Sequence, residues 1–531
     1  MNGRVVLKLI PLIALLMTTA QAAPLHLVIT DSETKTVIPA RVRLRDKDGK
    51  DHVPEDAVVV KIGHEDQWFA CSGELDIDVP VGPLEIRVEH GAEYAFHKET
   101  MEIAADVTNL AQVELKRWIN MRDRGYTCSD NHLHVPLEKL GPQLAAEGLD
   151  FGTSLQWWDG PQFKVDLEEG FLAPLEFAGR TIPTSAYDFE IERGWGAVYV
   201  IGMPRPLEAE KDEGRPNLPL LKQAREAGAL ICYQGGWSRE VLLDALLGYV
   251  DVVNVCNNNF HRHRFQPRSK YSNLLDVPGF PRYADDPQGM IDLNTETYYR
   301  LLNRGLQMTG GEGSGTGVKP SRVGFNRAYV QTGEEGTYKQ FIDAWRAGRN
   351  LVTNGPMPFV TVDVTDTERT ETHTPGDVID LPEGGGDLTI TVEVLSDAPM
   401  ASVELIINGE VQAKVDKFDD VTNRTKGSIQ RKVTEGSWIA VRAQAQDRLL
   451  EQEDLDKYDQ GEQAKPNRIL FGHTSPVYVR VGGKLARKNV AVAEALAMLG
   501  ALENYAKEHI GEKWEEEFKE AIQQARQKLK S

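Results

Sequence analysis

Cysteines and long apolar runs are scarce in this chain of 531 residues, and basic side chains are fewer than acidic ones. Four cysteines cannot form a disulfide scaffold at this length. Cys232 and Cys256 could still pair if the chain is secreted, but the strand pattern around each favours a small buried thiol. Beyond the N-terminus no stretch approaches the ~20 apolar residues that a membrane-spanning helix requires.

Basic residues number 60 against 80 acidic ones, so the formal net charge is −20. Since that charge repels phosphate, nucleic acids and anionic membranes are not expected as partners. Several catalytic signatures are also missing: the nucleophile elbow, the zincin helix motif and the cysteine pairs of a zinc ribbon. The apolar share of 41% is that of an ordinary globular protein, and the length predicts three or four domains at ~150 residues each.

The first 22 residues have the organisation of a secretory signal peptide. Two basic residues precede the apolar run at 9–17, and Ala20-Gln21-Ala22 supplies small residues at cleavage spacing. A membrane anchor is the alternative, but the run is short and contains Pro11. We therefore expect a secreted or periplasmic protein.

Three types of hydrophobic pattern divide the remaining chain. Apolar residues alternate with polar ones over 24–117 and again over 356–484, which predicts an N-terminal and a C-terminal β-sandwich. Within the second, Asn408-Gly409 predicts a hairpin turn. Residues 485–531 show helical spacing and predict a tail whose apolar stripe packs on a domain face.

Helices alternate with short buried strands between residues 118 and 355. Four predicted helices each end at a glycine and lead into an apolar strand, at 219–227, 239–247, 296–304 and 338–347. This alternation predicts parallel strands, and about seven strand candidates favour a closed or distorted (β/α) barrel over an open doubly wound sheet. In either architecture, residues just past the carboxyl ends of the strands line the functional site.

One group of residues has the composition of a metal site. Asp130, His132 and His134 alternate at the first strand of the α/β region, so their side chains can share one face. Neutral imidazole and carboxylate are ligands for Zn²⁺, Mn²⁺ or Fe²⁺. A second alternating acidic set could supply a further carboxylate: Asp188, Glu190 and Glu192. Two ordinary polar strand residues are the alternative for the His-x-His pair, but Asp130 and the strand-end location favour metal.

Three further features of the sequence could contribute residues to the same functional site. Residues 261–263 read His-Arg-His, which could supply replacement ligands or bind an anion, although a solvated basic loop is the favoured interpretation. The glycine-rich run 310–317 could cradle an anion but lacks the Lys-Ser/Thr ending of a P-loop. Trp157 and Trp158 could form a sugar-stacking platform, with core packing at least as well supported for one of the two rings.

Residues 130–134, which read Asp-Asn-His-Leu-His, resemble the opening metal motif of the polymerase and histidinol phosphatase (PHP) superfamily, specifically its CehA/McbA-type metallohydrolases. Three more stretches are similar to motifs of that family, at 145–150, 299–305 and 345–356, and the last is the most specific. The resemblance covers roughly residues 118 to 360. It implies a distorted (β/α)7 barrel, flanked by β domains, that hydrolyses phosphoester, ester or amide bonds through a metal-activated water.

The resemblance also implies roles for individual residues. His132 and His134 match the family's first two metal ligands, and Asp130 matches the acid ahead of them. Glu190, or Glu192, corresponds loosely to a bridging glutamate. Asp130 would then orient a ligand or act as a base, which makes Asp130 and Glu190 the expected catalytic carboxylates.

The sequence departs from the family at four further steps that normally carry His or Asp. These steps read Gln156-Trp157-Trp158, Gly196-Ala197, Tyr233-Gln234-Gly235-Gly236 and Gly313-Ser314-Gly315. Amide and glycine do not replace anionic or imidazole ligands, so at most one divalent metal is expected. Glu312, His261 and His263 are additional ligand candidates.

Two functions follow from this pattern. The first, which we favour, is a secreted hydrolase with one metal held by His132, His134 and a glutamate, acting on a small molecule or a glycan. The second is a catalytically degenerate barrel that binds a carbohydrate or another small polar ligand. The candidate substrate-binding residues at the barrel mouth are Trp157, Trp158, Gln234, Asn259, His261, Arg262, His263 and Glu312.

Overall fold

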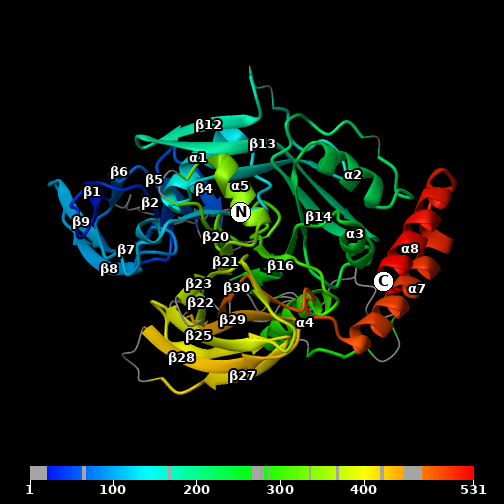
Figure 1. The fold of residues 1–531 in the computed structure, drawn as a ribbon. Coiled ribbons are helices and arrows are strands. Elements are labelled where there is room, and N and C mark those ends of the chain that lie inside the picture. Colours follow the sequence, from blue (N-terminus) through cyan, green and yellow to red (C-terminus); the bar gives the residue numbers. More distant parts are fainter. Residues whose placement is uncertain are drawn as a thin grey trace, which may run out of the picture.

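The computed structural model describes residues 21–530 apart from 62–66, 166, 168, 210, 262–263, 266–276, 278–279, 285, 320, 334–335, 366–369, 419–423 and 448–468. Within these residues the chain is a mixed α/β protein, in which strands in several sheets predominate over seven α-helices. Figure 1 shows the N-terminal strands in blue, the central α/β region in green, a C-terminal sheet in yellow and two final helices in red. Most of the predicted signal peptide lies outside the described residues.

The N-terminal region consists of two sheets. Its strands are β1 (Ala22–Asp31), β2 (Ala40–Asp46), β3 (Asp51–His52), β4 (Val59–Lys61), β5 (Gln67–Cys71), β6 (Glu74–Pro80), β7 (Gly82–Glu89), β8 (His97–Ile103) and β9 (Asn109–Leu115). One sheet has the order β6-β1-β9, and the other has the order β4-β5-β2-β7-β8 with β3 beside β2. The predicted alternation is confirmed in β7, where Leu84, Ile86 and Val88 are buried in an apolar core that both sheets share.

The central region contains a seven-stranded sheet with the order β11-β13-β14-β15-β16-β19 and β12 beside β13. These strands are β11 (Gly152–Trp158), β12 (Leu172–Phe177), β13 (Arg180–Arg193), β14 (Gly196–Ile201), β15 (Leu230–Tyr233), β16 (Val252–Cys256) and β19 (Thr309–Glu312). A small separate hairpin pairs β17 (Phe260–His261) with β18 (Arg264–Phe265).

The prediction that the central strands all run parallel is wrong in part. β11 is parallel to β13, and β16 is parallel to both β15 and β19, but β14 is antiparallel to β13 and to β15. The reason is the connection between β13 and β14, which is only two residues long at Gly194-Trp195. Such a short link closes a hairpin and leaves no room for a helical crossover.

The helices of the central region are α1 (Leu137–Ala146), α2 (Leu218–Glu226), α3 (Val241–Leu247), α4 (Pro287–Leu302) and α5 (Tyr338–Arg346), with a 3-10 turn η1 at Arg122–Arg124. The predictions for α2, α3 and α5 are confirmed to within two residues at each end. α4 begins nine residues earlier than predicted, because the Asp286 carboxylate accepts the N–H of Gly289 at 2.8 Å and caps the helix there.

A nine-stranded sheet connects the central and C-terminal regions. Its order is β10-β20-β21-β30-β29-β26-β27, with β31 beside β29 and β24 beside β31, and a four-stranded sheet has the order β23-β22-β25-β28. The strands are β10 (Tyr126–Ser129), β20 (Arg327–Gln331), β21 (Asn350–Thr353), β22 (Met357–Thr365), β23 (Thr370–His373), β24 (Val378–Leu381), β25 (Gly386–Leu395), β26 (Met400–Ile407), β27 (Glu410–Val415), β28 (Arg424–Val433), β29 (Ser437–Gln446), β30 (Ile469–Thr474) and β31 (Val477–Val481). Because β21 pairs with β30, one sheet continues across the boundary predicted at residue 355.

Local sequence signals in the C-terminal region are confirmed. Asn408 and Gly409 both have positive φ, at 53° and 84°, and join β26 to β27 as the predicted hairpin. The tail forms α7 (Asn489–His509), a 3-10 turn η3 (Glu512–Trp514) and α8 (Glu515–Lys530). Phe518, Ile522 and Leu529 of α8 are buried, and this helix lies beside α3 and α7 (Figure 1).

The four cysteines are all free and buried, including Cys232 and Cys256. The favoured interpretation of buried thiols is therefore confirmed. Among the helices of the described residues, none combines the length and the apolar character that crossing a bilayer requires.

Candidate metal centre

His132 and His134 lie in the segment that follows β10 and reach toward the central sheet. The strand ends at Ser129, earlier than predicted. The segment beyond it is held by individual hydrogen bonds rather than by continuous strand pairing. The His134 N–H donates to the Thr316 carbonyl at 2.8 Å, and the Leu155 N–H of β11 donates to the Leu133 carbonyl at 3.0 Å. Leu133 is fully buried in an apolar cluster, which leaves the histidines on its two sides facing Glu190 on β13.

Three potential metal ligands converge at this point. The two histidine Nε2 atoms are 3.0 Å apart, and Glu190 Oε2 lies 3.4 Å from His132 Nε2 and 2.8 Å from His134 Nε2. The residues are 1%, 5% and 1% exposed in the order His132, His134 and Glu190. Metal–ligand bonds of about 2.0–2.1 Å in a tetrahedral arrangement place ligand atoms about 3.3 Å apart. This buried group could therefore hold one metal ion.

The protonation states of two of these three residues, His132 and Glu190, suit metal binding. Burial lowers the pKa of His132, which keeps its imidazole neutral. Burial also opposes the charged form of Glu190, but the two neighbouring histidines outweigh it and lower the Glu190 pKa to about 2. Burial lowers the pKa of His134 too, but contacts with Glu190 and Gln162 outweigh this and raise it overall. The centre thus combines an anionic carboxylate with one neutral and one easily protonated imidazole.

Gln162 fixes the orientation of His134, and no sequence pattern had indicated this residue. His134 Nδ1 and Gln162 Oε1 are 2.8 Å apart, and because an amide oxygen can only accept, the imidazole donates from Nδ1. The lone pair of Nε2 then points toward Glu190 and His132, as in metal sites whose histidines are oriented by an outer partner. Gln162 lies in an irregular loop after β11, so no periodicity could reveal it.

The structure does not bring Asp130 into this group, contrary to the expectation that it would share a face with the histidines. One carboxylate oxygen accepts the N–H groups of His132 and Ser314 at 3.1 Å each, and the other accepts that of Gly324 at 2.8 Å. Asp130 is fully buried, and burial raises its pKa to about 6. Since its hydrogen bonds join three chain segments, Asp130 positions His132 and is not placed to act as a ligand.

The carboxylate of Glu192 is likewise hydrogen-bonded to a residue outside the ligand group, so Glu190 is the glutamate of the candidate centre. Glu192 Oε2 accepts the indole N–H of Trp158 at 3.1 Å. The Trp158 ring is half-buried and lies 4.9 Å from the His134 ring, while Trp157 is buried in the core beside Phe189. Of the two tryptophans, Trp158 is therefore the one beside the candidate centre.

The other predicted site residues do not join the ligand group. Glu312 is fully buried, accepts the Asn131 N–H at 3.1 Å, and has a pKa well above its usual range because of burial. Gln234 donates to Asn258 Oδ1 at 2.7 Å, and the Asn259 backbone N–H donates to Asn257. His261 lies in the short strand β17. Arg262 and His263 fall outside the described residues.

Tyr199 is a further residue that sequence reasoning missed. It lies opposite Glu190 in the β13–β14 pair, and its ring centroid is 4.2 Å from that of His132. Its buried hydroxyl finds no hydrogen-bond partner among the residues that the structure describes. The signal that could have indicated it is the pairing of its strand with the acidic strand, which the sequence alone does not fix.

Neither a family model, nor a curated protein, nor a solved structure matches the chain. The family resemblance of residues 118–360 therefore stays a prediction.

The contact between His134 and Gln162 can be tested separately from the ligands. We expect Gln162→Ala to weaken metal affinity about 10- to 100-fold, since it frees the ring that Gln162 orients. Gln162→Glu should restore most of the affinity, because a carboxylate oxygen also accepts the Nδ1 proton. Metal titration followed by competition with a chelator measures both, and the exposed Gln67→Ala serves as control. Equal affinity of Gln162→Ala and wild type would show that the loop does not orient the ring.

Proposed function

We propose that this chain is a secreted metal-dependent hydrolase that acts on a phosphoester, ester or amide bond. The observation that carries the proposal is the convergence of two imidazole nitrogens and one carboxylate oxygen, all buried, at mutual distances of 2.8–3.4 Å. Three protein ligands leave a fourth position of a tetrahedral ion for water or substrate, which is the pattern of catalytic rather than structural metal sites. Zn²⁺, Mn²⁺ and Fe²⁺ suit this donor set.

Residues of the chain would hold the ion, orient one of its ligands and fix the backbone that carries another. His132, His134 and Glu190 hold the ion, and the negative charge of Glu190 offsets part of its charge. Gln162 keeps the Nε2 lone pair of His134 directed at it, and Asp130 fixes the backbone of the His132 segment. The bound ion would supply Lewis acidity, which lowers the pKa of water and polarises a phosphoryl or carbonyl oxygen.

The surroundings support one ion rather than a cluster. At one of the steps where the resembling family carries further ligands, the side chains of this chain are hydrogen-bonded to other buried residues. Tyr233 donates to the buried Asp244, and Gln234 donates to Asn258. Within the described residues, the only group of three or more such ligands close enough to hold an ion is His132, His134 and Glu190.

We propose further that residues 118–355 form a distorted PHP-like barrel, that the flanking sheets are β-sandwiches, and that residues 1–22 are a signal peptide. The strand-end location of the histidines supports the barrel, and the shared apolar core of the two N-terminal sheets supports the N-terminal sandwich. The basic residues and the apolar run at the start of the chain support the signal peptide. The buried free cysteines are compatible with a secreted chain that needs no disulfides.

A binding function without catalysis is the second candidate, and one observation favours it. The half-buried Trp158 ring lies beside His134, where an aromatic face could stack on a sugar. In that case the same three ligands would hold an ion, or none, without turning a substrate over.

A substrate panel separates the two functions. Protein stripped with a chelator and reloaded with Zn²⁺, Mn²⁺ or Fe²⁺ is assayed on nitrophenyl phosphate mono- and diesters, a nitrophenyl ester and a nitroanilide. We expect hydrolysis only after reloading, and at least 100-fold less of it in Glu190→Gln. His26→Ala, which removes a partly exposed imidazole from β1 of the N-terminal region, should behave as wild type. A metal-loaded wild type no faster than Glu190→Gln on every substrate would leave only the binding function.

A further inference from the structure

Tyr199 is a buried tyrosine beside the candidate metal centre, and the proposed function leaves its hydroxyl without a role. The residue lies on β14 directly opposite Glu190 of β13, so both side chains project from the same face of the sheet. Its ring centroid is 4.2 Å from that of His132, and the two ring planes are inclined by 36°. Tyr199 is thus a ring neighbour of one ligand and the cross-strand neighbour of another.

The Tyr199 hydroxyl makes no hydrogen bond with any residue that the structure describes, although the side chain is fully buried. A donor that is removed from water and left without an acceptor is unfavourable, which is why most buried polar groups in proteins are hydrogen-bonded. Unbonded buried hydroxyls also occur at Ser129 and Ser238, so a missing partner does not by itself identify a site. What distinguishes Tyr199 is its contact with the His132 ring.

The side chains next to Tyr199 are directed at other groups or accept hydrogen bonds poorly. Glu190 Oε2 lies 2.8 Å from His134 Nε2 and 3.4 Å from His132 Nε2. Cys232, which lies opposite Tyr199 on β15, carries a thiol, and sulfur is a weak acceptor. The acceptor for the hydroxyl is therefore expected from outside the chain.

An ion held by the three ligands would bring such an acceptor to this place, because three protein ligands leave a fourth position for an oxygen of water or substrate. We propose, on the basis of the proposed function, that the Tyr199 hydroxyl donates a hydrogen bond to the oxygen at this fourth position. A second aromatic donor beside the centre, Trp158, does not take this role, since its indole N–H already donates to Glu192 at 3.1 Å.

The hydroxyl acts in this arrangement as a donor that keeps its proton. An ordinary phenol has a pKa of about 10 and is neutral at neutral pH. A carbonyl or phosphoryl oxygen gains negative charge as it is attacked, and a donor already in place within a buried site stabilises that charge without having to reorganise. Tyr199 therefore favours substrates that present a strongly accepting oxygen to the ion.

Anion binding to the cobalt-loaded full chain tests this hydrogen bond without substrate turnover. Co²⁺ takes the same tetrahedral ligand sets as Zn²⁺, and its visible absorption changes when the fourth ligand changes. Fluoride is a strong hydrogen-bond acceptor and chloride a weak one, so each is titrated while the absorption is recorded. We expect Tyr199→Phe to weaken fluoride binding at least about 10-fold and chloride binding less than about 2-fold, because only fluoride uses the hydroxyl.

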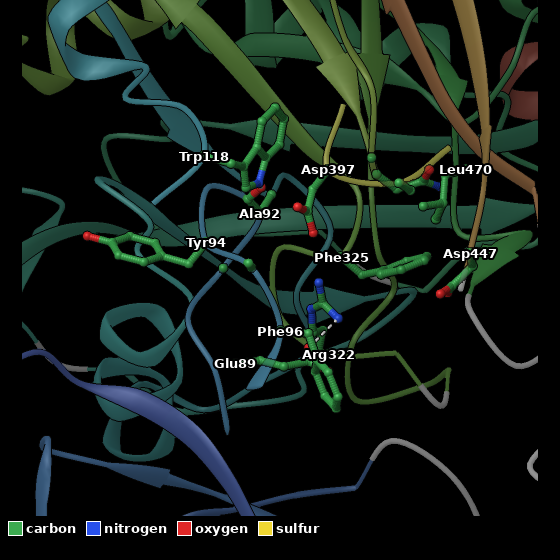
Figure 2. Close-up of a pocket in the computed structure, with 15 residues that line it drawn as sticks. Glu89, Ala92, Tyr94, Phe96, Trp118, Arg322, Phe325, Asp397, Asp447 and Leu470 are labelled. Carbon is green, nitrogen blue, oxygen red and sulfur yellow. Dashed lines mark hydrogen bonds and ion pairs between the residues drawn. The ribbon is translucent and has the colours of Figure 1, made fainter. Parts of the chain in front are cut away.

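Tyr94→Phe is the matched control, since it removes a buried hydroxyl that has a partner. Tyr94 lines a separate pocket where the N-terminal, central and C-terminal regions meet (Figure 2), and its hydroxyl donates to Asp31 at 2.6 Å. We expect Tyr94→Phe to lower the Tm of the metal-free protein and to leave fluoride affinity unchanged. Tyr199→Phe should keep or raise that Tm, because it removes a donor without an acceptor, and should take up as much cobalt as wild type.

Failure of the Tyr199 hydrogen bond and failure of the proposed function give different results. If wild type takes up no cobalt, the metal centre and the hydrogen bond are both refuted. If cobalt binds, the hydrogen bond alone is overturned when wild type binds no fluoride at about 100 mM, when Tyr199→Phe binds it equally well, or when Tyr199→Phe loses its cobalt. A fluoride effect of Tyr199 in a protein that hydrolyses no substrate of the panel would support the hydrogen bond and refute the hydrolase.

Discussion

Replacing His132 and His134 together by alanine is expected to leave the protein without its metal. Wild type should carry about one equivalent of a transition metal after reloading and desalting, and the double variant less than about a tenth of that. The reason is that Glu190 is then the only ligand left, and one carboxylate alone does not hold the ion. Asp130 and Glu192 cannot replace the imidazoles, since the carboxylates of these two residues are hydrogen-bonded to other groups. Elemental analysis by mass spectrometry measures the ratio.

Thermal unfolding provides a second measurement of the same loss. A ligand at 100 times its Kd stabilises the folded state by about 2.7 kcal/mol, so added metal should raise the Tm of wild type but not that of the double variant. His26→Ala again controls for loss of an exposed imidazole, whose side chain is 36% exposed. Equal metal content in wild type and in the double variant would remove the basis for a metal centre at these residues.

Glu147→Ala is expected to cost about 3–5 kcal/mol of folding free energy, because it removes one partner of a buried charge network. Glu147 follows α1 and is 2% exposed. Its carboxylate lies 3.0 Å from Arg41 of β2, 3.2 Å from Arg322 and 3.6 Å from Arg327. Without it, the carboxylate of Glu89 still contacts Arg41 and Arg322, but Arg327 loses the carboxylate beside it.

Urea unfolding followed by circular dichroism and by tryptophan fluorescence measures this cost. Glu147→Gln, which keeps the shape of the side chain and removes its charge, should lose a similar amount. The matched control is Glu114→Gln, since Glu114 pairs with Lys35 at the surface with 56% of its side chain exposed. There the expected loss is below about 1 kcal/mol. A loss at Glu147 no larger than that at Glu114 would mean that the buried network adds little to stability.

The fold was predictable wherever the signal is local. The turn at Asn408-Gly409 and the ends of α2, α3 and α5 depend on positive φ and on side-chain spacing within a few residues. The direction of β14 was not predictable in the same way. It depends on the two-residue link between β13 and β14, and the sequences of these two strands would equally suit parallel strands joined by a crossover. The continuation of one sheet across residue 355 depends on β30, which is far along the chain from β21.

The residues of the candidate site were also predictable only in part. The His-x-His spacing and the acidic strand identified His132, His134 and Glu190 as candidates, and the structure brings these three together. The spacing of Asp130 predicted a ligand, but its carboxylate oxygens accept hydrogen bonds from the backbone N–H groups of Ser314 and Gly324. Gln162 and Tyr199 carried no sequence signal, since one lies in an irregular loop and the other on an ordinary apolar strand.

The sequence by itself determined the chemistry that is available: imidazoles two residues apart, a run of alternating carboxylates, an acidic surface and too few cysteines for a scaffold. Only the tertiary structure decided which carboxylate meets the imidazoles and which are occupied by backbone donors or by Trp158. The physical reason is that spacing along one strand sets the face of a side chain, whereas its distance to another strand depends on sheet pairing and loop path. Those distances in turn decide whether three ligands enclose a single ion.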